Sequence, residues 1–533
     1  MRKVMLIFLF CLPCQIFAQT SRNTTLIGNL EYGSERGGFF GSANDVWGYT
    51  DDQGNDYAIV GHYTGVSIAK VESTGLEEVA FVPGVLSNWR DIKTHDHYAY
   101  VTADERNDGL TIIDLGGLPD SVRLVGTDTT AFKKAHNLYI ADGYAYISGS
   151  NAAGGADILD LANPEAPVKV GEWTGHYFHD VYVRNDTLFG SAFNRGSLVI
   201  LDVGDKSAPV QITEILPGPN VHNAWTTEDG KYVMTTQERT GLTVKMWDIR
   251  DPFNAEIVDE YLAAPSLLAH NTHILGDYAY ISHYGDGLRI VDISDPTNLV
   301  EVGHYDTFTS NQGGFEGNWG AFPFTSSGYI YATDEDFGLF VVSFNGRRAA
   351  RLSGQVLDAQ TGQPVSDVTI EVKELEQSTT SDAEGNYKLG FSDPGLFTIL
   401  AYRASYDTTK FTFNAEEGES KTFDVMMNSA TSVDEQKSVI PASYSIEQNY
   451  PNPFNPNTII RYSLPEKTHV RLKVFDTLGR EVRVLFDGEQ LRGEQQTSWN
   501  GRDNSGRLVA SGVYFYRIET DAFRKTTKML FIE

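Results

Sequence analysis

"AHNLYIADGYAYIS" (residues 135–148) and "AHNTHILGDYAYIS" (residues 269–282) are nearly copies of one another. Each copy begins with a His-Asn pair, called the strand head here. It continues through an apolar strand, a turn containing Gly and Asp, and a second strand. Looser versions of this unit recur along the chain. The second polar residue of each strand head falls at Asp45, Asp91, Asn137, Asp180, Asn223, Asn271 and Asn318.

The strand heads are 43 to 48 residues apart, a spacing that indicates an array of repeats. After its second strand, each repeat has a third strand such as "SLVILDV", a polar turn, and an outer strand such as "LVEVGHY". Four strands in each of seven repeats predict an all-β fold whose main domain, residues 24–347, is a seven-bladed β-propeller. The Asp that ends the third strand is suited to accept a backbone N–H from the following turn.

The two ends of the array complement each other. The seventh repeat stops after its third strand, at Phe344, and so lacks an outer strand. "TLIGNLEY" at 25–32 resembles the outer strand "LVEVGHY" at 299–305. We expect the N-terminal strand to complete the last blade, because closing the ring protects strand edges that an open array would expose.

Two smaller domains are predicted after the propeller. Residues 351–428 alternate apolar and polar positions around turn signals such as "SDAEGNY", which predicts a small antiparallel β-sandwich. A polar linker over residues 429–442 follows. Residues 443–533 show the same kind of pattern, and we expect a second small β-sandwich there.

The N-terminus has the features of a signal peptide over residues 1–18. Arg2 and Lys3 precede a short apolar run, and Ala18 stands at a suitable cleavage position. Both cysteines of the chain lie in this segment, so we expect the exported protein to contain no disulfide bond. No later stretch approaches 18 apolar residues, which predicts a mature chain without a transmembrane span.

The chain is strongly acidic, with a formal net charge of −29. Nucleic-acid binding requires a basic surface, so we predict no nucleic-acid partner. An acidic surface is compatible with divalent cations, and a divalent cation is the cofactor that this composition would suit. A soluble extracellular surface is the simpler explanation of the same charge.

The strands "LRIVDIS" and "LVILDV" resemble the LVIVD repeat. The stretch "ANDVWGYTDDQGNDYAIVG", which begins at residue 43, is similar to the choice-of-anchor B family of secreted bacterial proteins. That resemblance implies a propeller with varied C-terminal anchors and implies no settled activity. Residues 351–428 resemble the carboxypeptidase regulatory-like domain, which implies a spacer or adhesive module rather than a peptidase.

The C-terminal stretch resembles the type A sorting domain of type IX secretion substrates. The matching residues begin with "NYPNPFNP" at 449–456, and the motif positions are Asn449, Pro451, Asn452, Pro453 and Phe454. The resemblance implies passage through the periplasm and export across the outer membrane by the type IX secretion machinery. It also implies removal of the domain, with the product attached to surface lipopolysaccharide or released. The expected location is extracellular or on the outer-membrane surface.

Four strand heads carry a histidine, and these are the weak metal candidates of the sequence: His136, His179, His222 and His270. If the inner strands line the channel, the strand heads form a ring at one mouth, where His and carboxylates could bind a metal or act as acid and base. A structural role is the alternative. Successive side chains in a strand point to opposite faces, so repeated His–Asp/Asn hydrogen bonds could tie neighbouring blades together.

Departures from the repeat are further candidates for a site. Arg90 replaces the head histidine in the second repeat, and the seventh repeat contains Glu316 and Trp319. Acidic loops at 102–109 and 332–338 are expected near one rim. Four tryptophans near strand heads could form an aromatic platform, although core packing is the alternative: Trp47, Trp89, Trp225 and Trp319. The complete candidate ligand ring is Asp45, Arg90, Asp91, His136, Asn137, His179, Asp180, His222, Asn223, His270, Asn271, Glu316 and Trp319.

Two functional hypotheses follow from this sequence. The first is a binding or adhesion protein whose propeller recognises an extracellular glycan or protein through one mouth. The second is an extracellular hydrolase or lyase that depends on a metal or on His and Asp. The chain shows no serine-nucleophile elbow, phosphate-binding Gly loop or zinc-spaced cysteine set, so no catalytic residue is assigned.

Overall fold

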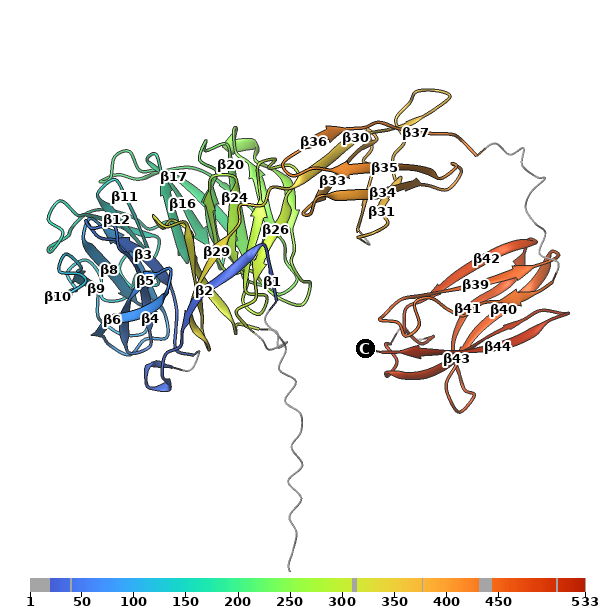
Figure 1. Cartoon of the computed structure of the whole chain (residues 1–533), viewed down its shortest axis with the longest axis horizontal. Helices are drawn as coiled ribbons and strands as arrows, with labels where there is room; N and C mark the ends of the chain where they lie inside the picture. The colour runs from blue at the N-terminus through green and yellow to red at the C-terminus, as the bar shows by residue number, and fades with distance from the viewer. Residues whose placement is uncertain are drawn as a thin grey trace, which may run out of the picture. The chain divides into compact units, whose positions relative to one another are not determined.

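The computed structural model describes residues 20–38, 41–308, 314–375, 377–430, 443–504 and 507–532. In this part of the chain the strands form eleven sheets, accompanied by two 3-10 turns, η1 (Ser34–Arg36) and η2 (Pro252–Asn254). The predicted all-β class is therefore confirmed (Figure 1). The predicted signal peptide and residues 431–442 of the predicted linker lie outside the described residues. No helix among the described residues is long and apolar enough to cross a bilayer.

Seven four-stranded blades make up the predicted propeller. The first three are β3 (Val46–Thr50), β4 (Asp56–His62), β5 (Gly65–Glu72) and β6 (Gly75–Pro83); β7 (Arg90–His95), β8 (Tyr98–Ala103), β9 (Leu110–Asp114) and β10 (Arg123–Asp128); and β11 (Asn137–Ala141), β12 (Tyr144–Ser148), β13 (Ala156–Asp160) and β14 (Val168–Trp173). The fourth and fifth are β15 (Asp180–Arg184), β16 (Thr187–Ala192), β17 (Ser197–Asp202) and β18 (Val210–Ile215); and β19 (Val221–Thr226), β20 (Tyr232–Gln237), β21 (Val244–Asp248) and β22 (Glu256–Tyr261). The sixth is β23 (Thr272–Leu275), β24 (Tyr278–Ser282), β25 (Leu288–Asp292) and β26 (Val300–Tyr305), and the seventh is β27 (Asn318–Phe322), β28 (Tyr329–Asp334), β29 (Gly338–Phe344) and the N-terminal β2 (Thr24–Leu30).

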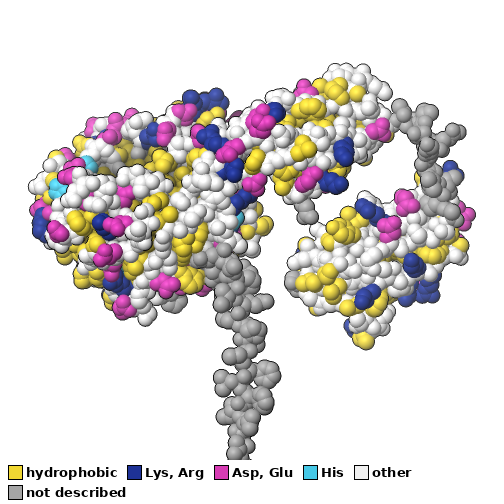
Figure 2. Space-filling model, in the orientation of Figure 1, with side chains coloured by type: hydrophobic (Ala, Val, Ile, Leu, Met, Phe, Trp, Pro, Cys, Tyr) yellow, Lys and Arg dark blue, Asp and Glu magenta, His cyan; other side chains and the backbone are white. Residues whose placement is uncertain are grey.

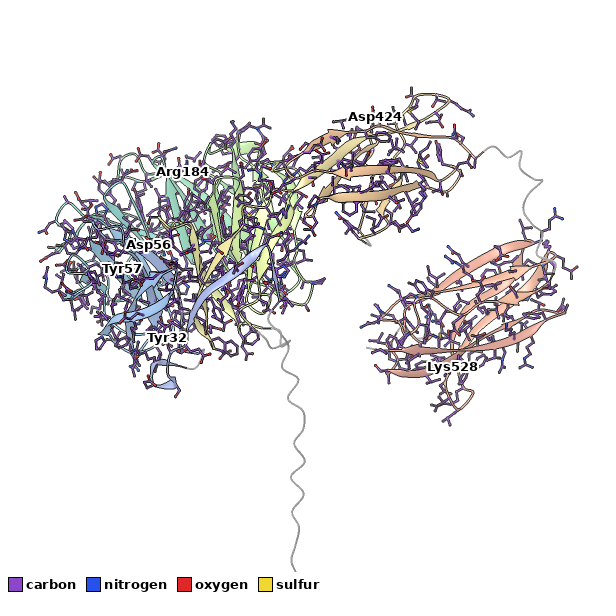
Figure 3. The ribbon with its side chains drawn as sticks, viewed as in Figure 1. Tyr32, Asp56, Tyr57, Arg184, Asp424 and Lys528 are labelled. Atoms are coloured by element: carbon purple, nitrogen blue, oxygen red, sulfur yellow. The ribbon has the colours of Figure 1, made fainter. Side chains whose placement is uncertain are left out.

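The ring closes as predicted. β2 pairs with β29 in antiparallel register, from Thr24 opposite Phe344 to Leu30 opposite Leu339. The short β1 (Ser21–Arg22) adds to the edge of the sixth blade. The first inner strand, β3, contacts the last, β27, so the inner strands form a complete circle. Asp56, labelled in Figure 3, joins the first and last blades by accepting the Ser327 N–H at 3.0 Å.

A β-bulge occurs between the third and outer strands of every blade. The pairing register skips one residue of the outer strand each time, and that residue is always Ile or Val: Ile27, Val79, Val125, Val170, Ile212, Val258 and Val302. A bulge increases the local twist of a sheet, which suits strongly twisted propeller blades. The N-terminal strand carries the same bulge as the other outer strands, so it is a true member of the repeat.

The predicted turns after the third strands are also confirmed. In five blades the Asp that ends the third strand accepts the backbone N–H of the residue two positions later, at 2.7 to 3.0 Å. The five residues are Asp114, Asp160, Asp202, Asp248 and Asp292. Acidic and basic side chains are interspersed on the face that Figure 2 shows.

A small sandwich of two four-stranded sheets follows the propeller and encloses its own apolar core. One sheet contains β33 (Asn386–Phe391), β30 (Ala350–Asp358), β36 (Ser420–Thr422) and β37 (Val425–Met427), and the other contains β32 (Gln377–Thr380), β31 (Thr369–Val372), β34 (Gly395–Tyr402) and β35 (Thr409–Ala415). The antiparallel prediction was wrong for one strand. β30 pairs in parallel with β36 and with β37, because the chain crosses from one sheet to the other before it returns.

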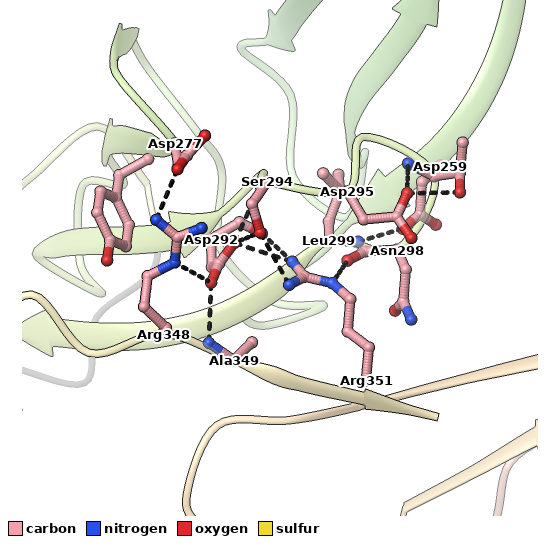
Figure 4. Close-up of polar contacts among 12 residues, drawn as sticks. Asp259, Asp277, Asp292, Ser294, Asp295, Asn298, Leu299, Arg348, Ala349 and Arg351 are labelled. Atoms are coloured by element: carbon pink, nitrogen blue, oxygen red, sulfur yellow. Dashed lines mark hydrogen bonds and ion pairs between the residues drawn. The ribbon is translucent and has the colours of Figure 1, made fainter. Parts of the chain in front are cut away.

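The sandwich is joined to the sixth blade by buried polar contacts (Figure 4). The guanidinium of Arg351 donates to a carboxylate oxygen of Asp292 at 2.9 Å and to the Asn298 carbonyl at 3.0 Å. The other carboxylate oxygen of Asp292 accepts the Ala349 N–H at 2.8 Å. Asp292 therefore serves both its own turn and the interdomain contact.

Residues 428–533 form a separate compact unit. Its strands are β38 (Ser445–Ile446), β39 (Thr458–Leu464) and β42 (Gly493–Trp499) in one sheet, and β41 (Glu481–Gln490), β40 (Thr468–Phe475), β43 (Gly512–Glu519) and β44 (Arg524–Phe531) in the other. An apolar core around Trp499, Tyr516 and Phe531 lies between the two sheets.

Candidate functional site

The backbone of the strand heads ties each blade together. The N–H of His136 donates to the Ser148 carbonyl at 3.1 Å, and the N–H of His270 donates to the Ser282 carbonyl at 2.9 Å. Hydroxyl groups also link neighbouring blades. The Thr236 hydroxyl of the fifth blade donates to the His270 carbonyl at the head of the sixth, at 2.6 Å. Thr333 makes the same bond to the carbonyl of Asn44, which stands in the histidine position of the first blade. These ties use the backbone, so they do not require a histidine ring.

The four head imidazoles contact one another in series around one mouth of the channel, with the first pair stacked and the second pair T-shaped. Ring centroids lie 3.9 Å apart for His136 and His179, 4.4 Å for His179 and His222, and 4.3 Å for His222 and His270. The series ends on Trp319, whose ring centroid is 4.5 Å from that of His270. The structure thus brings all four candidate histidines and Trp319 together.

This opening, called the histidine mouth here, holds a cavity of about 290 Å³. Exposed aromatic side chains form part of its rim, with Phe315 52% and Tyr177 40% exposed. The remaining lining residues are Trp89, Asp104, His136, His179, His222, Glu238, Tyr284 and Trp319. A concave site with aromatic walls and a few converging polar groups is typical of ligand-binding pockets.

Two carboxylates face the imidazoles from loops that follow second strands. Asp104 lies 2.9 Å from Nδ1 of His136. Burial would raise the pKa of Asp104, but the hydrogen bond and charge of His136, with the charge of Lys134, outweigh it and the pKa is lowered. Glu238 Oε1 accepts the Tyr284 hydroxyl at 2.5 Å and lies 4.0 Å from Nε2 of both His222 and His270.

The inner imidazoles are neutral at neutral pH. Burial lowers the pKa of His222 and of His270 to about 3. Burial, together with the neighbouring imidazoles, also holds the pKa of His179 well below its usual value. Each of these rings therefore presents a nitrogen lone pair, the form in which histidine binds a metal.

A second ring of polar side chains lies beneath the histidines, and it carries the second residue of five strand heads: Asp45, Asp91, Asn137, Asp180 and Asn223. Asn137 donates to Asp91 at 2.6 Å and to Asp180 at 3.1 Å, and Asn223 donates to Asp180 at 3.3 Å. Lys93 completes the ring by contacting the carboxylates of Asp91 and Asp45. Blades are therefore tied in this ring by Asp–Asn and Asp–Lys contacts. One His–Asp contact of the kind that the structural alternative expected joins the second and third blades, between Asp104 and His136.

Burial controls the charges in this polar ring. It raises the pKa of Asp180 to about 7, against the lowering effect of hydrogen bonding from Asn223 and of Lys93. Burial also raises the pKa of Asp91, although the nearby Lys93 ammonium opposes this shift. For Lys93 itself the three nearby carboxylates outweigh burial, and the pKa is raised. Lys93 therefore remains the buried cation of the channel.

Three other predicted ring members belong neither to the histidine mouth nor to the polar ring. Arg90 is buried and donates to the carbonyls of His62 and Val85, so it joins the first two blades instead of facing a ligand. Glu316 is exposed outside the lining of the cavity. Asn271 is buried deeper, with its backbone N–H 3.1 Å from the Ser282 hydroxyl.

The predicted platform of four tryptophans divides between the two ends of the channel. Trp89 and Trp319 line the histidine mouth. Trp47 and Trp225 line a second cavity of about 400 Å³ at the other end of the inner strands, among Tyr139, Phe322, Phe324 and neighbouring residues. There the rings pack on one another, with the Trp225 and Phe324 centroids 5.4 Å apart, which favours the core-packing alternative for this pair.

Sequence reasoning missed Glu238, Tyr284 and Lys93. Lys93 stands two positions after Asp91 in "WRDIKTH", and the two-residue period of a strand places it on the same face. Glu238 follows the second strand of its blade, as Asp104 does in the predicted acidic loop 102–109. Alignment of these loops would have found Glu238.

The predicted sorting motif lies in the C-terminal unit. Asn449 is buried, and its side chain donates to the Thr458 hydroxyl at 2.9 Å. Phe454 packs on Phe531 with ring centroids 5.2 Å apart. The motif residues between these two anchors are exposed: Pro451, Asn452 and Pro453.

The protein is thus defined as a β-propeller with accessory β-sandwich domains, and family models agree. LVIVD repeats match at residues 88–123, 133–174, 192–215 and 268–307. A CarboxypepD_reg-like domain matches residues 352–437, and an FlgD Ig-like domain matches residues 457–522. No curated protein matches the chain.

Solved structures resemble part of the chain at low sequence identity. Hydrazine synthase from Kuenenia stuttgartiensis is 12% identical, with 58% of this chain and 98% of that chain covered and a TM-score of 0.44. The Cps50 (Swd1) β-propeller domain from Myceliophteria thermophila is 12% identical, with 60% and 98% covered and a TM-score of 0.43. A protein from Lactobacillus plantarum is 11% identical, with 66% and 98% covered and a TM-score of 0.43. These likenesses concern the fold alone.

Proposed function

We propose that this protein is an exported binding protein whose propeller recognises an extracellular glycan at the histidine mouth. The observation that carries the proposal is the cavity of about 290 Å³, with exposed aromatic rings at its rim and imidazole and carboxylate groups on its floor. Aromatic faces stack on the C–H faces of sugar rings. Carboxylates such as Asp104 accept hydrogen bonds from sugar hydroxyls.

The proposal extends to export. The C-terminal unit matches an FlgD Ig-like domain, and its "NYPNPFNP" motif resembles type IX sorting signals. We propose that the type IX secretion machinery carries the chain across the outer membrane. The product then stays on surface lipopolysaccharide or is released, and the choice-of-anchor B resemblance of the propeller agrees with such a location.

A second candidate function is a hydrolase or lyase that acts on extracellular polymers. It is favoured by one observation, the closeness of two neutral imidazoles, His179 and His222, to the carboxylate of Glu238. Such a set of groups is found in metal-dependent hydrolases. Release of reducing ends from a bound polysaccharide would distinguish this candidate from simple binding.

Glycan binding is tested with the purified full chain on an array of extracellular polysaccharides and oligosaccharides. Trp319→Ala and Phe315→Ala are expected to weaken binding at least ten-fold, because each removes a ring of the cavity. Phe253→Ala is the matched control, since Phe253 is also exposed but lies on η2, outside that cavity. Binding that survives both cavity variants, or binding to a protein in the absence of any glycan, would contradict the proposal.

Export is tested in a bacterium that possesses the type IX machinery. Deletion of residues 443–533 is expected to leave the protein in the periplasm, while the intact chain reaches the surface or the medium. Equal amounts of both proteins outside the cell would refute the export proposal and leave the glycan result unaffected.

A further inference from the structure

Glu238 is held in the histidine mouth without a full counter-charge. Among the described residues, the basic side chains within 4.0 Å of its carboxylate are the neutral imidazoles of His222 and His270, each at 4.0 Å between Oε1 and Nε2. That separation is too long for a hydrogen bond, so these groups do not satisfy one another. The Nδ1 atom of His222 is also buried without a hydrogen-bond partner among the described residues. The imidazole nitrogens and the Glu238 carboxylate therefore converge on one point without bonding to one another.

We propose that His179, His222 and Glu238 bind a divalent transition-metal ion of the zinc class. One nitrogen of each histidine and one oxygen of Glu238 lie within 4.8 Å of one another. Ligands of tetrahedral zinc lie about 3.4 Å apart when the metal–ligand bonds are about 2.1 Å long. The three side chains must therefore close by up to about 1.4 Å, and His179 and Glu238 border the cavity, which leaves space for that movement.

Neighbouring groups already orient this set. The Tyr284 hydroxyl donates to Glu238 Oε1 and fixes the carboxylate, as outer-shell donors do in metal sites. His270 Nδ1 lies 2.6 Å from the Trp319 carbonyl, which places the ring proton on Nδ1 and leaves Nε2 with a free lone pair toward Glu238. His270 is thus available as a further ligand on the same side of the carboxylate.

The donor set selects the kind of ion. Imidazole nitrogens favour zinc and its transition-metal neighbours, whereas calcium and magnesium prefer sites built from oxygen alone. Three protein ligands leave one tetrahedral position, and that position opens to the cavity of about 290 Å³. A water molecule or a polar group of a ligand would occupy it. The metal proposal stands whether or not the cavity binds a glycan.

The test is a titration of chelator-treated, untagged full chain with Zn²⁺ alone, followed by calorimetry, and with Co²⁺, followed by its visible absorption. We expect one equivalent to bind, with a tetrahedral cobalt spectrum. Glu238→Gln and His179→Gln should each weaken the affinity at least ten-fold. His304→Gln is the matched control, because His304 faces another carboxylate, Glu301 at 3.1 Å, on the outer strand of the sixth blade.

Thermal melting of each variant shows whether that variant still folds. If Glu238→Gln does not fold, His179→Gln decides, since His179 is half-buried rather than fully enclosed. Absence of stoichiometric Zn²⁺ binding would overturn the proposal, as would equal affinity in wild type, Glu238→Gln and His179→Gln. Glycan binding by the chelator-treated protein is measured separately, so failure of one proposal does not imply failure of the other.

Discussion

Asp292 and Arg351 form a fully buried ion pair, 2.9 Å long, between the sixth blade and the first strand of the sandwich (Figure 4). Asp292 also caps the turn that follows its own strand by accepting the Ser294 N–H at 3.0 Å. In the other four blades the equivalent Asp contacts residues of its own blade, as Asp114 does with Arg123. A repeated structural position has thus become the attachment point of a second domain.

Replacing Arg351 with Met is expected to uncouple the two domains. The substitution leaves the Asp292 carboxylate buried with much of its compensation removed, a change that costs about 3 to 5 kcal/mol in comparable cases. Calorimetry of the full chain should show the sandwich melting earlier than in wild type. Arg403→Met is the control, because Arg403 makes a partly exposed ion pair of 4.0 Å and its loss should change stability by less than about 1 kcal/mol. Equal melting of both variants would contradict this role.

Replacing Lys93 with Met should destabilise the propeller by about 3 to 5 kcal/mol, because the Asp45 and Asp91 carboxylates would lose their buried cation. The loss is expected to shrink at low pH, where protonation of the carboxylates removes the uncompensated charge. Urea unfolding at pH 5 and pH 8 measures both effects. Lys231→Met, at an exposed ion pair, is the control. A loss that is independent of pH would show that Lys93 acts through packing alone.

Deleting residues 20–30 should open the ring. The deletion removes β1 and β2 and exposes the edge of β29, and unpaired edges associate with other chains. A lower melting temperature and concentration-dependent oligomers are expected in size-exclusion chromatography. Deletion of residues 20–22 removes β1 alone and should leave a monomer. An unchanged monomer after the longer deletion would mean that β2 does not hold the ring closed.

Stability should fall as pH rises toward neutrality, in part because of Asp334. Burial raises the pKa of Asp334 to about 7, well above the value near 4 of an unfolded chain. The folded form therefore keeps a proton that the unfolded form has lost. Stability due to this group is full below pH 4 and is lost by about pH 7, an effect of about 4 kcal/mol.

Asp334→Asn should flatten this part of the pH profile. The amide can keep the bonds to the N–H groups of Asp336 and Phe337 and can donate to the Thr307 hydroxyl. Denaturant unfolding between pH 4 and pH 8 provides the comparison. Glu335, whose pKa burial also raises, will retain its own pH dependence in the variant. Identical profiles of the variant and wild type would exclude Asp334 as a contributor.

Within the predicted sorting motif, Phe454→Ala should destabilise the C-terminal unit by about 3 to 5 kcal/mol. Phe454 is 2% exposed and packs between Trp499 and Phe531. Tyr450→Ala is the control within the same motif, because Tyr450 is 79% exposed. Hydrogen exchange of β39 to β44 in the full chain measures the difference. Similar protection in both variants would show that the motif does not stabilise the domain.

Features that depend on short stretches of chain could be predicted from the sequence. Local hydrogen bonding and two-residue alternation account for the strand pattern and for the turn after Asp114 and its equivalents. They also account for the closing strand at 24–30. The seven blades follow from the number of repeats. The rough position of the histidines followed as well, because each begins an inner strand.

Only the tertiary structure decided how the strand heads meet across the channel. His136 contacts Asp104 of the preceding blade and also stacks on His179, 43 residues away, and its neighbour Asn137 joins two aspartates. Glu238 reaches the histidines from a loop after a second strand. The physical reason is that ring closure fixes the tilt of every blade, and the tilt determines which face of each strand points into the channel. The alternation of residues along a strand defines its two faces. It does not determine which side chains of other blades each face will meet.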